Sequence, residues 1–382
     1  MKNNNKQSSQ KPLTVNQRRW RKFKTLRRGY YSLIIISICY LISFFLPLLI
    51  NNRALIVHYN GETYFPAFRD LMDVPGLKLL TSPPFISGVS LGQLGNEGEC
   101  NYRQLQEQYE QDAASDNYVI MPLYPYGPLE DITAGNPAFA APLEEKEGAA
   151  GRIFGTDDRG RDIFARMLYG FQVSITFGLI LTILQYLIGV PIGAAMGYWG
   201  GKFDMFLQRF MEIWSTLPVL FLIIILVALL NPKSTIFQFT MLLILSAIFA
   251  WLGPASQMRA QFYRERARDY VAAAISIGVP THKILFKHIL PNSLVPIVTS
   301  LPFAVVSGIT SLLSLDFLGF GLMPPTPSWG QMVSVGLANL TNGYWWLILV
   351  PLSAMFLTLI AVVFIGEAIR EAFDPKVFSR LR

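Results

Sequence analysis

The sequence predicts an all-α integral membrane protein with six transmembrane helices, one N-terminal helix followed by a five-helix core. Of its 382 residues, 52% are hydrophobic and only 15% are charged, whereas a soluble protein carries about a quarter charged residues. The apolar residues fall in blocks close to the roughly 20-residue length that crosses a bilayer. One long hydrophilic section, residues 51–150, separates the first block from the other five, and it predicts an extracytoplasmic insertion after the first helix.

The first transmembrane helix is expected at residues 30–50, after a basic N-terminal segment at residues 1–29. That segment contains ten Lys or Arg residues and no acidic residue, which predicts a cytoplasmic N-terminus. The apolar block is too long for a signal peptide, so we expect it to remain uncleaved. Trp20, Phe23 and Leu26 recur at helical spacing, which fits either a helix lying on anionic lipid or a simple topology signal.

Residues 51–150 are acidic, with fourteen acidic against five basic residues. Turn-forming pairs such as Asn60-Gly61 and Gly127-Pro128 interrupt the section. We therefore expect a partly folded insertion that packs on the outer membrane face, and the residues leave open whether it folds on its own.

The five core spans are expected at residues 174–198, 211–230, 235–252, 293–315 and 345–365. Six crossings from a cytoplasmic N-terminus place both the C-terminus and the segment at 257–292 in the cytoplasm. The six basic residues of that segment agree with this placement. No internal repeat is visible, which argues against an inverted-repeat secondary transporter.

The sequence contains no pattern typical of a catalytic, metal or nucleic-acid site. Cys39 lies in the first span and Cys100 in the insertion, so we expect no disulfide. The three histidines lack metal-ligand spacing, and no nucleophile elbow is visible. The pI near 9.3 follows from basic residues on the cytoplasmic side and needs no nucleic acid. Residues 200–203, GGKF, lack the hydroxyl residue that follows the lysine of a phosphate-binding loop, so a nucleotide must be bound by another chain.

Residues 257–292 form a polar, helix-forming segment between two spans. The stretch from Asp269 to Ile277 is rich in alanine, and Gly278 can adopt the positive φ that ends many helices. Thr281 is a candidate N-cap for a second short helix. Small side chains on a helix pair at a membrane exit are suited to docking into a groove of a soluble partner.

A charged, glycine-punctuated turn precedes the second span. We refer to residues 155–162 as the signature turn, and its characteristic residues are Gly155, Thr156, Asp157, Gly160, Arg161 and Asp162. A metal site is the alternative interpretation, but Arg159 and Arg161 compete for the aspartates as ion-pair partners.

A second loop, at residues 315–330, follows the fifth span. It contains Asp316, Gly319, Gly321, Pro325 and Trp329. An acidic residue at membrane depth is by default a functional-site hypothesis. The alternatives for Asp316 are a position in water at the outer rim and a cap on a short re-entrant helix.

Three glycines in the second span, Gly189, Gly193 and Gly197, lie four residues apart. They leave bare patches on one helix face, so we expect a neighbouring backbone to pack closely there. Packing alone explains this spacing, although a gate would use the same close contact.

These motifs, in this order, resemble the ABC-importer permeases of the dipeptide/oligopeptide family. Residues 155–162 resemble the family's GTD-x-x-GRD signature. Residues 315–330 resemble the FLGxG…PPxPSWG element near the extracytoplasmic gate, and we refer to them as the candidate gate loop. Residues 365–375 resemble the C-terminal GDxLRDxLDP motif, with Glu367 and Glu371 in place of two aspartates.

Residues 257–292 resemble the cytoplasmic coupling loop of the same permeases, and we refer to them as the coupling segment. The resemblance rests on Ala273 and Ala274, Gly278, and the pair Leu290-Pro291; Ala272 stands at a usually acidic position and His288 at a usual isoleucine. Short motifs ahead of the core look like the microcin C/oligopeptide (Yej-type) subgroup, namely Arg27-Arg28-Gly29-Tyr30 and Tyr59-Asn60-Gly61.

The resemblance implies a permease subunit in a bacterial inner membrane, without enzymatic activity or a cofactor of its own. It implies a heterodimer with a second permease, two ATP-binding-cassette ATPase domains that bind ATP and Mg²⁺, and an extracytoplasmic solute-binding protein. Closure of the ATPases would push the helix at 273–278 and switch the pore. Peptides or peptide-like solutes are the expected substrates, with nickel as an alternative. An ion-driven secondary transporter and a membrane-anchored assembly protein are the rival classes.

Overall fold

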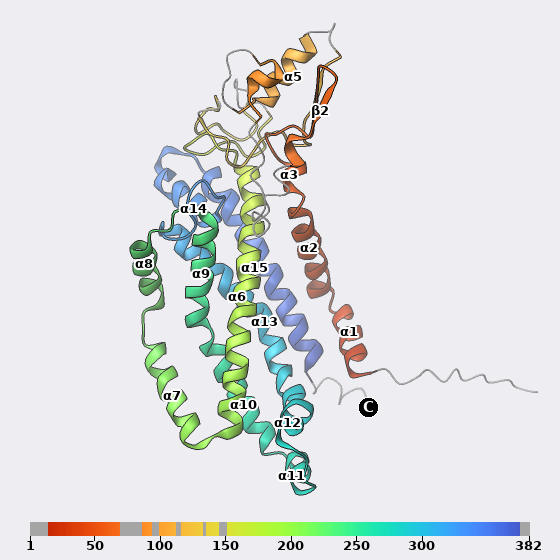
Figure 1. Ribbon diagram of the computed structural model, residues 1–382, viewed down its shortest axis with the longest axis vertical. Coiled ribbons are helices and arrows are strands. Elements are labelled where there is room, and N and C mark those ends of the chain that lie inside the picture. The colour runs from red at the N-terminus through yellow and green to blue at the C-terminus, as the bar shows by residue number, and fades with distance from the viewer. Residues whose placement is uncertain are drawn as a thin grey trace, which may run out of the picture.

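The computed structural model describes residues 14–68, 86–93, 99–111, 116–132, 135–144 and 151–374. Within these residues a long helix bundle carries a small folded region at one end (Figure 1); we refer to this region, the described part of residues 51–144, as the cap. Predictions that concern residues 1–13, the gaps inside the insertion and residues 375–382 lie outside this part of the chain.

The elements follow one another in two groups. The N-terminal group is α1 (Val15–Thr25), α2 (Arg27–Ser43), α3 (Leu46–Leu49), β1 (Ile56–Tyr59), β2 (Glu62–Tyr64), η1 (Gly88–Leu91), α5 (Tyr102–Gln111) and β3 (Tyr118–Ile120). The bundle continues with α6 (Ile163–Trp199), α7 (Gly201–Ser215), α8 (Val219–Leu230), α9 (Thr235–Ala250), α10 (Leu252–Arg266), α11 (Asp269–Ser276), α12 (Thr281–Lys283), η3 (Ile284–Ile289), α13 (Leu290–Phe317), α14 (Trp329–Ala338), η4 (Leu340–Asn342) and α15 (Trp346–Phe373).

Among the described residues, four helical stretches are long and apolar enough to cross a membrane. They are Ile163–Trp199, Thr235–Arg266, Thr281–Phe317 and Trp346–Phe373. The pair α7 and α8, bent by 72°, adds a fifth if it is one broken span. α2 has 17 residues and is about 26 Å long, slightly less than the roughly 30 Å hydrocarbon core. The chain is thus a multi-span helical membrane protein.

Prolines explain why two expected spans are not continuous helices. The span expected at 30–50 begins earlier, at Arg27, and α2 ends at Ser43 before α3, because Pro47 has no N–H to continue the helix. The span expected at 211–230 is interrupted between α7 and α8 at Pro218 for the same reason. The coupling segment also differs from expectation, since its first ten residues belong to α10, which extends the fourth span to Arg266.

The glycine face of α6 packs directly against α10. A Cβ added at Gly193 would lie 2.1 Å from the carbonyl oxygen of Ala255, and one at Gly189 would lie 2.5 Å from that of Trp251. A Cβ at Gly197 would approach the Phe262 side chain to 2.5 Å. The close helix contact expected from the glycine spacing is therefore confirmed, and it joins the C-terminal part of α6 to α10.

The chain is mostly helical, as expected, and the cap adds a three-stranded antiparallel sheet with the order β2-β1-β3. Asn60 and Gly61 connect β1 to β2 with φ values of +49° and +83°, the geometry of a tight hairpin turn that an Asn-Gly pair favours. Val57, Leu91 and Leu105 are fully buried in a core of the cap's own.

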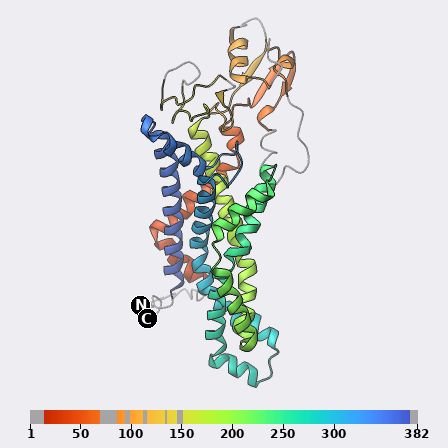
Figure 2. The ribbon, with the colours of Figure 1, turned by 90° about the vertical axis from the view of Figure 1, so that its left-hand side faces the viewer.

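The cap is joined to the bundle by hydrogen bonds and apolar contacts at the end of the first span. Tyr124 N–H donates to the Leu49 carbonyl at 3.0 Å, and Asn51 N–H donates to the Tyr124 carbonyl at 3.2 Å. Tyr124 also packs with Ile50 and Ala165 of α6. The cap and α11 lie at opposite ends of the molecule (Figures 1 and 2).

α1 packs on the last turns of α15. Phe23 is buried against Ala368 and Ala372, and Lys22 Nζ lies 3.4 Å from a carboxylate oxygen of Glu371. α15 thus covers Phe23, whereas Trp20 is 51% exposed, so the apolar face is covered only in part and both interpretations of this segment, a helix on anionic lipid and a topology signal, stay open.

Candidate functional site

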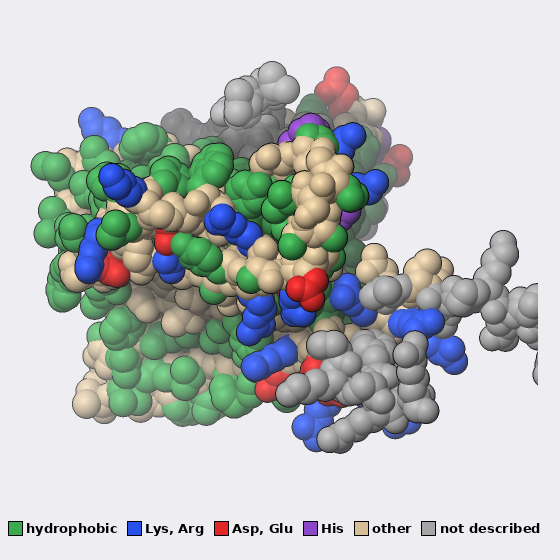
Figure 3. All heavy atoms as spheres, turned by 90° about the horizontal axis from the view of Figure 1, so that it is seen from below, with side chains coloured by type: hydrophobic (Ala, Val, Ile, Leu, Met, Phe, Trp, Pro, Cys, Tyr) green, Lys and Arg blue, Asp and Glu red, His purple; other side chains and the backbone are tan. Residues whose placement is uncertain are grey.

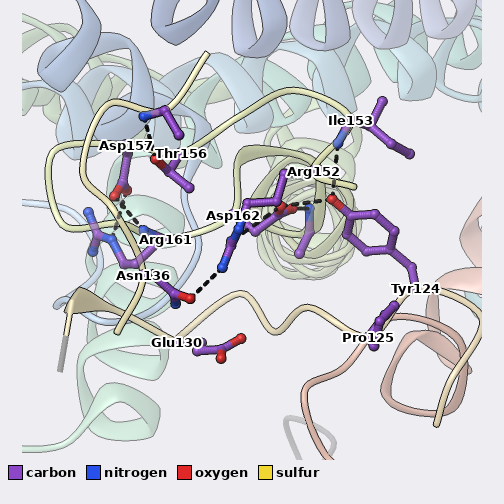
Figure 4. Close-up of polar contacts among 12 residues, drawn as sticks. Tyr124, Pro125, Glu130, Asn136, Arg152, Ile153, Thr156, Asp157, Arg161 and Asp162 are labelled. Atoms are coloured by element: carbon purple, nitrogen blue, oxygen red, sulfur yellow. Dashed lines mark hydrogen bonds and ion pairs between the residues drawn. The ribbon is translucent and has the colours of Figure 1, made fainter. Parts of the chain in front are cut away.

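The signature turn is a buried polar network at the beginning of α6. The Asp162 carboxylate caps the helix by accepting the Ala165 N–H at 2.8 Å. It also accepts the Tyr124 hydroxyl at 2.8 Å and lies 3.5 Å from the Arg152 guanidinium. Arg152 in turn donates to Asn136 at 2.6 Å. The network therefore ties the cap to the first turn of α6 (Figure 4).

Asp157 organises the rest of the turn. One carboxylate oxygen accepts the N–H groups of Arg159 and Arg161, both at 2.9 Å. The other accepts Arg161 Nε at 2.8 Å and lies 3.7 Å from Arg166 Nε. Because N–H groups and guanidinium groups occupy these oxygens, the alternative of a metal site at the aspartates does not fit this geometry.

Two glycines make the turn sterically feasible. Gly155 and Gly160 have φ values of +71° and +72°, and a Cβ at Gly155 would lie 2.2 Å from the Ala140 carbonyl oxygen. Between them, the Thr156 hydroxyl accepts the Ala140 N–H at 2.8 Å and donates to the Pro137 carbonyl at 2.7 Å. A side chain at Gly155 would thus displace the cap from the turn.

Asp162 and Tyr124, which share a hydrogen bond, both have shifted pKa values. Burial raises the pKa of the Asp162 carboxyl, while the bonds from Ala165 and Tyr124 and the charge of Arg152 lower it. Burial also raises the pKa of Tyr124, and the neighbouring Asp162 charge adds to this effect. Tyr124 therefore remains a hydrogen-bond donor at neutral pH.

The candidate gate loop connects α13 to α14 and folds around Asp316. This carboxylate is 2% exposed, which excludes the alternative of a side chain in water at the outer rim. It accepts the Leu322 N–H at 2.7 Å and the Ser328 hydroxyl at 2.5 Å. Ser328 is the N-cap of α14, so Asp316 positions that cap. A Cβ at Gly321 would lie 1.8 Å from Asp316 Oδ1.

The loop is also attached to α6. Trp329 is buried and donates its indole N–H to the Met167 carbonyl at 2.8 Å, and a Cβ at Gly170 would lie 2.8 Å from that ring. Arg166 donates to the Pro325 carbonyl at 3.4 Å. Gly319 has φ +83° with open space around it.

The signature turn and the candidate gate loop meet around one cavity of about 450 Å³. Asp157, Arg161 and Arg166 line one side, and Asp316 and Gly319 line another. Sequence reasoning missed Arg166 and Gln238, which also lines the cavity. Both are buried polar residues inside or beside an apolar run, and this is the signal that would have identified them.

The coupling segment lies at the opposite end of the bundle from the signature turn and the gate loop. α11 ends in a hydrogen-bonded cap, in which Gly278 N–H donates to the Ile275 carbonyl and Val279 N–H donates to the Ala274 carbonyl, both at 3.0 Å. Gly278 has φ +76°, as expected for a glycine in this C-terminal motif. Pro280, and not Thr281, is the N-cap of α12, so the expectation for Thr281 was wrong.

One face of the coupling segment is buried and the other is exposed. Val271 and Ala274 pack against Met258 and Phe262 of α10 and Ile284 of η3, which fixes α11 to the end of the bundle. The outward face is formed by Ala272, Ala273, Ile275, Ile277, Gly278 and Phe286. Ile277 is 80% exposed and Phe286 is 69% exposed.

The end of the segment returns the chain to α13. Leu290 and Pro291 form its first turn, with Pro291 exposed and Leu290 half-buried. The His288 carbonyl accepts the Asn292 amide at 3.1 Å. Figure 3, which views this end of the molecule, shows Lys and Arg side chains spread over the surface beside apolar groups and few acidic ones.

Comparisons with known proteins identify the family. The family model for binding-protein-dependent transport system inner membrane components matches residues 189–379. The peptidoglycan transport system permease protein YejE of Agrobacterium fabrum is 37% identical over 364 residues, which cover 95% of this chain and 93% of the relative. The inner membrane ABC transporter permease protein YejE of Escherichia coli is 37% identical over 361 residues, 94% and 97% of the two chains. The oligopeptide transport system permease protein OppC of Haemophilus influenzae is 39% identical over 226 residues, 59% of this chain and 70% of the relative.

Proposed function

We propose that this chain, which belongs to the family of binding-protein-dependent transport system inner membrane components, is the membrane-spanning permease subunit of an ATP-driven importer of peptides or peptide-like solutes. It is a transport component and not an enzyme. The observation that carries the proposal is the coupling segment, a short helix ending at Gly278 with its outer face exposed at one end of the bundle.

The outer face of α11 has the properties of a docking surface. Ala272 and Ala273 are small, so a partner can approach the helix backbone closely. Ile275 and Ile277 next to them are 58% and 80% exposed, and apolar groups in such a position favour burial by a partner. We propose that an ATPase subunit receives this face in a cleft and moves it when ATP closes the ATPase dimer.

The charges support one orientation in the membrane. Lys and Arg side chains are scattered over the end of the bundle that carries α11, with fewer acidic ones (Figure 3), and by the positive-inside rule this end faces the cytoplasm. We propose that both termini lie on that side and that the acidic cap is extracytoplasmic. The count of six crossings then requires that α2 with α3 form the first span and that the bent pair α7 and α8 form the third.

The importer requires partners that this chain does not contain. They are a second permease, in a heterodimer, two ATP-binding-cassette ATPase domains that hold ATP and Mg²⁺, and an extracytoplasmic solute-binding protein, while the lipid bilayer surrounds the bundle. We do not expect the chain to bind nucleic acid. Energetically, the ATPases drive transport only if they bind the two permease conformations with different affinities.

The proposed substrate class follows the relatives, whose names refer to peptidoglycan and oligopeptide transport. Nickel is the alternative solute. The binding protein selects the solute in such systems, so the gene products encoded beside this chain identify it most directly.

Uptake measurements test the function. The complete importer in proteoliposomes should accumulate a labelled oligopeptide when ATP is enclosed with the ATPases, and an imposed proton or sodium gradient should not replace ATP. Uptake that follows the ion gradient without ATP would support a secondary transporter instead. A complex that assembles but moves no solute would favour an assembly protein.

A further inference from the structure

We infer that Gln238 is a positioning residue that ties the candidate gate loop to the helix that carries the coupling segment. This inference rests on the proposed function and assigns to one side chain the link between the two ends of the permease. Gln238 lies in α9 and is 5% exposed.

Both hydrogen-bonding ends of the Gln238 amide are used by the loop. Its Nε2 donates to the Gly321 carbonyl, and its Oε1 accepts the Met323 N–H at 2.7 Å. A buried amide that satisfies a donor and an acceptor of the same loop can do so in only one loop conformation, and it is costly to leave unpaired. The two hydrogen bonds of Gln238 therefore fix the position of α9 relative to the loop.

α9 is connected to α11 of the coupling segment through α10. It forms with α10 one helical stretch from Thr235 to Arg266, and only Ala267 and Arg268 separate that stretch from α11. Near its far end Arg259 is held by Asp204 of α7, with Nη2 at 2.7 Å from the carboxylate. A force on α11 thus reaches Gln238 through α10 and α9, two helices that meet at Trp251.

The loop is held from a second side that does not move with α9 alone. Arg166 and Met167 of α6 contact Pro325 and Trp329, whereas Gln238 holds Gly321 and Met323. The cavity of about 450 Å³ lies between these attachments. A shift of α9 relative to α6 would therefore pull the two parts of the loop apart and change the width of the cavity.

The test uses the complete importer with its ATPases and binding protein in proteoliposomes. Gln238→Met keeps the side-chain length and removes both bonds, and Gln238→Glu keeps the acceptor for Met323 while losing the donor. Thr240→Ala, at an exposed position of the same helix, is the matched control. We measure solute transported per ATP hydrolysed, and hydrogen exchange of residues 318–325.

Gln238→Met is expected to lower the transport per ATP by at least about fivefold and to speed exchange of the Met323 amide by about tenfold. Gln238→Glu places a carboxylate oxygen against the Gly321 carbonyl, so it should lower the transport per ATP at least as much as Gln238→Met, and Thr240→Ala should match the wild type. Unchanged transport per ATP in both Gln238 variants would overturn the inference, even if exchange becomes faster, because the contact would then be structural only.

The Gln238→Glu ratio decides the question if Gln238→Met prevents assembly. Failure of the wild-type importer to use ATP at all would contradict the proposed function itself, which is a different outcome from a change confined to the Gln238 variants.

Discussion

At the end of the bundle beside the cap, the carboxylates of Asp162 and Asp316 are buried, whereas at the end with α11 apolar side chains are exposed. Asp162 and Asp316 are 0% and 2% exposed and each accepts at least two hydrogen bonds. Ile277 and Phe286, by contrast, are 80% and 69% exposed. Breaking a buried polar network destabilises a chain strongly, while an exposed apolar group contributes little to its own chain and is available to a partner. We therefore expect stability to depend on the first end and assembly with the ATPases on the second.

Asp162→Ala should have the largest effect on stability. It removes the N-cap of α6 and the carboxylate that lies 3.5 Å from the buried Arg152 guanidinium, which should lower the free energy of unfolding by about 3–5 kcal/mol. Thermal unfolding of the purified chain in detergent measures the loss. Asp158→Ala is the control, because Asp158 is half-exposed and lies 3.5 Å from Arg161; an equal loss in both variants would contradict the role of the network.

Gly193→Ala should come next, since it tests the contact between α6 and α10 that connects the two ends. The added Cβ meets a backbone carbonyl, so we expect a loss of about 2 kcal/mol. Gly253→Ala, in α10 with nothing near its added Cβ, should be neutral or slightly stabilising. Equal unfolding midpoints for the two variants would show that the close contact is not maintained.

Gly278→Val should cost less stability and more function. A β-branched residue at φ +76° strains the backbone by about 1–2 kcal/mol, but its Cβ has no other atom within 4 Å. Insertion into the membrane should be normal and ATP-driven uptake should be lost. Gly278→Asn is the comparison, because Asn tolerates positive φ and should retain more uptake; wild-type uptake by Gly278→Val would remove the coupling role.

Ile277→Ser should leave stability within about 0.5 kcal/mol of the wild type and still weaken the complex. We expect the purified permease to retain the ATPases about tenfold less well, as measured by co-purification. Val271→Ser, at a fully buried position of the same helix, should instead lower the unfolding midpoint. Normal ATPase retention by Ile277→Ser would indicate that the exposed face docks elsewhere.

Hydropathy predicted the helical membrane core, because few other folds are available to a chain with several long apolar runs. The cap was harder, since Asn60-Gly61 was recognised as a turn but its hairpin was not, and three- and four-residue strands carry little periodicity. Pro218 lies inside an apolar run whose length and composition predict one continuous span, so the break between α7 and α8 was not predicted. The polar residues at 257–266 were predicted to be helical, but not to continue the fourth span as α10, because their polarity is unusual for a span and the packing on the glycine face of α6 is a tertiary contact.

The site was predictable only where a local motif carries it. The residues of the signature turn and of the candidate gate loop were named from their resemblance to the family's motifs, and the glycine that ends α11 from its place after an alanine-rich stretch. The partners of Asp162 were not, because Tyr124 and Arg152 come from outside the motif and reach it only through the fold of the cap. Gln238 lies about eighty residues from the loop that it holds, and no local pattern connects the two.

Photo-crosslinking from position 277 in the assembled importer tests the central claim most directly. A photoreactive amino acid in place of Ile277 should form its adduct with an ATPase subunit, and the yield should change when ATP is bound. An adduct with the solute-binding protein, or labelling of Ile277→Cys by a membrane-impermeant reagent from the extracytoplasmic side, would contradict the account.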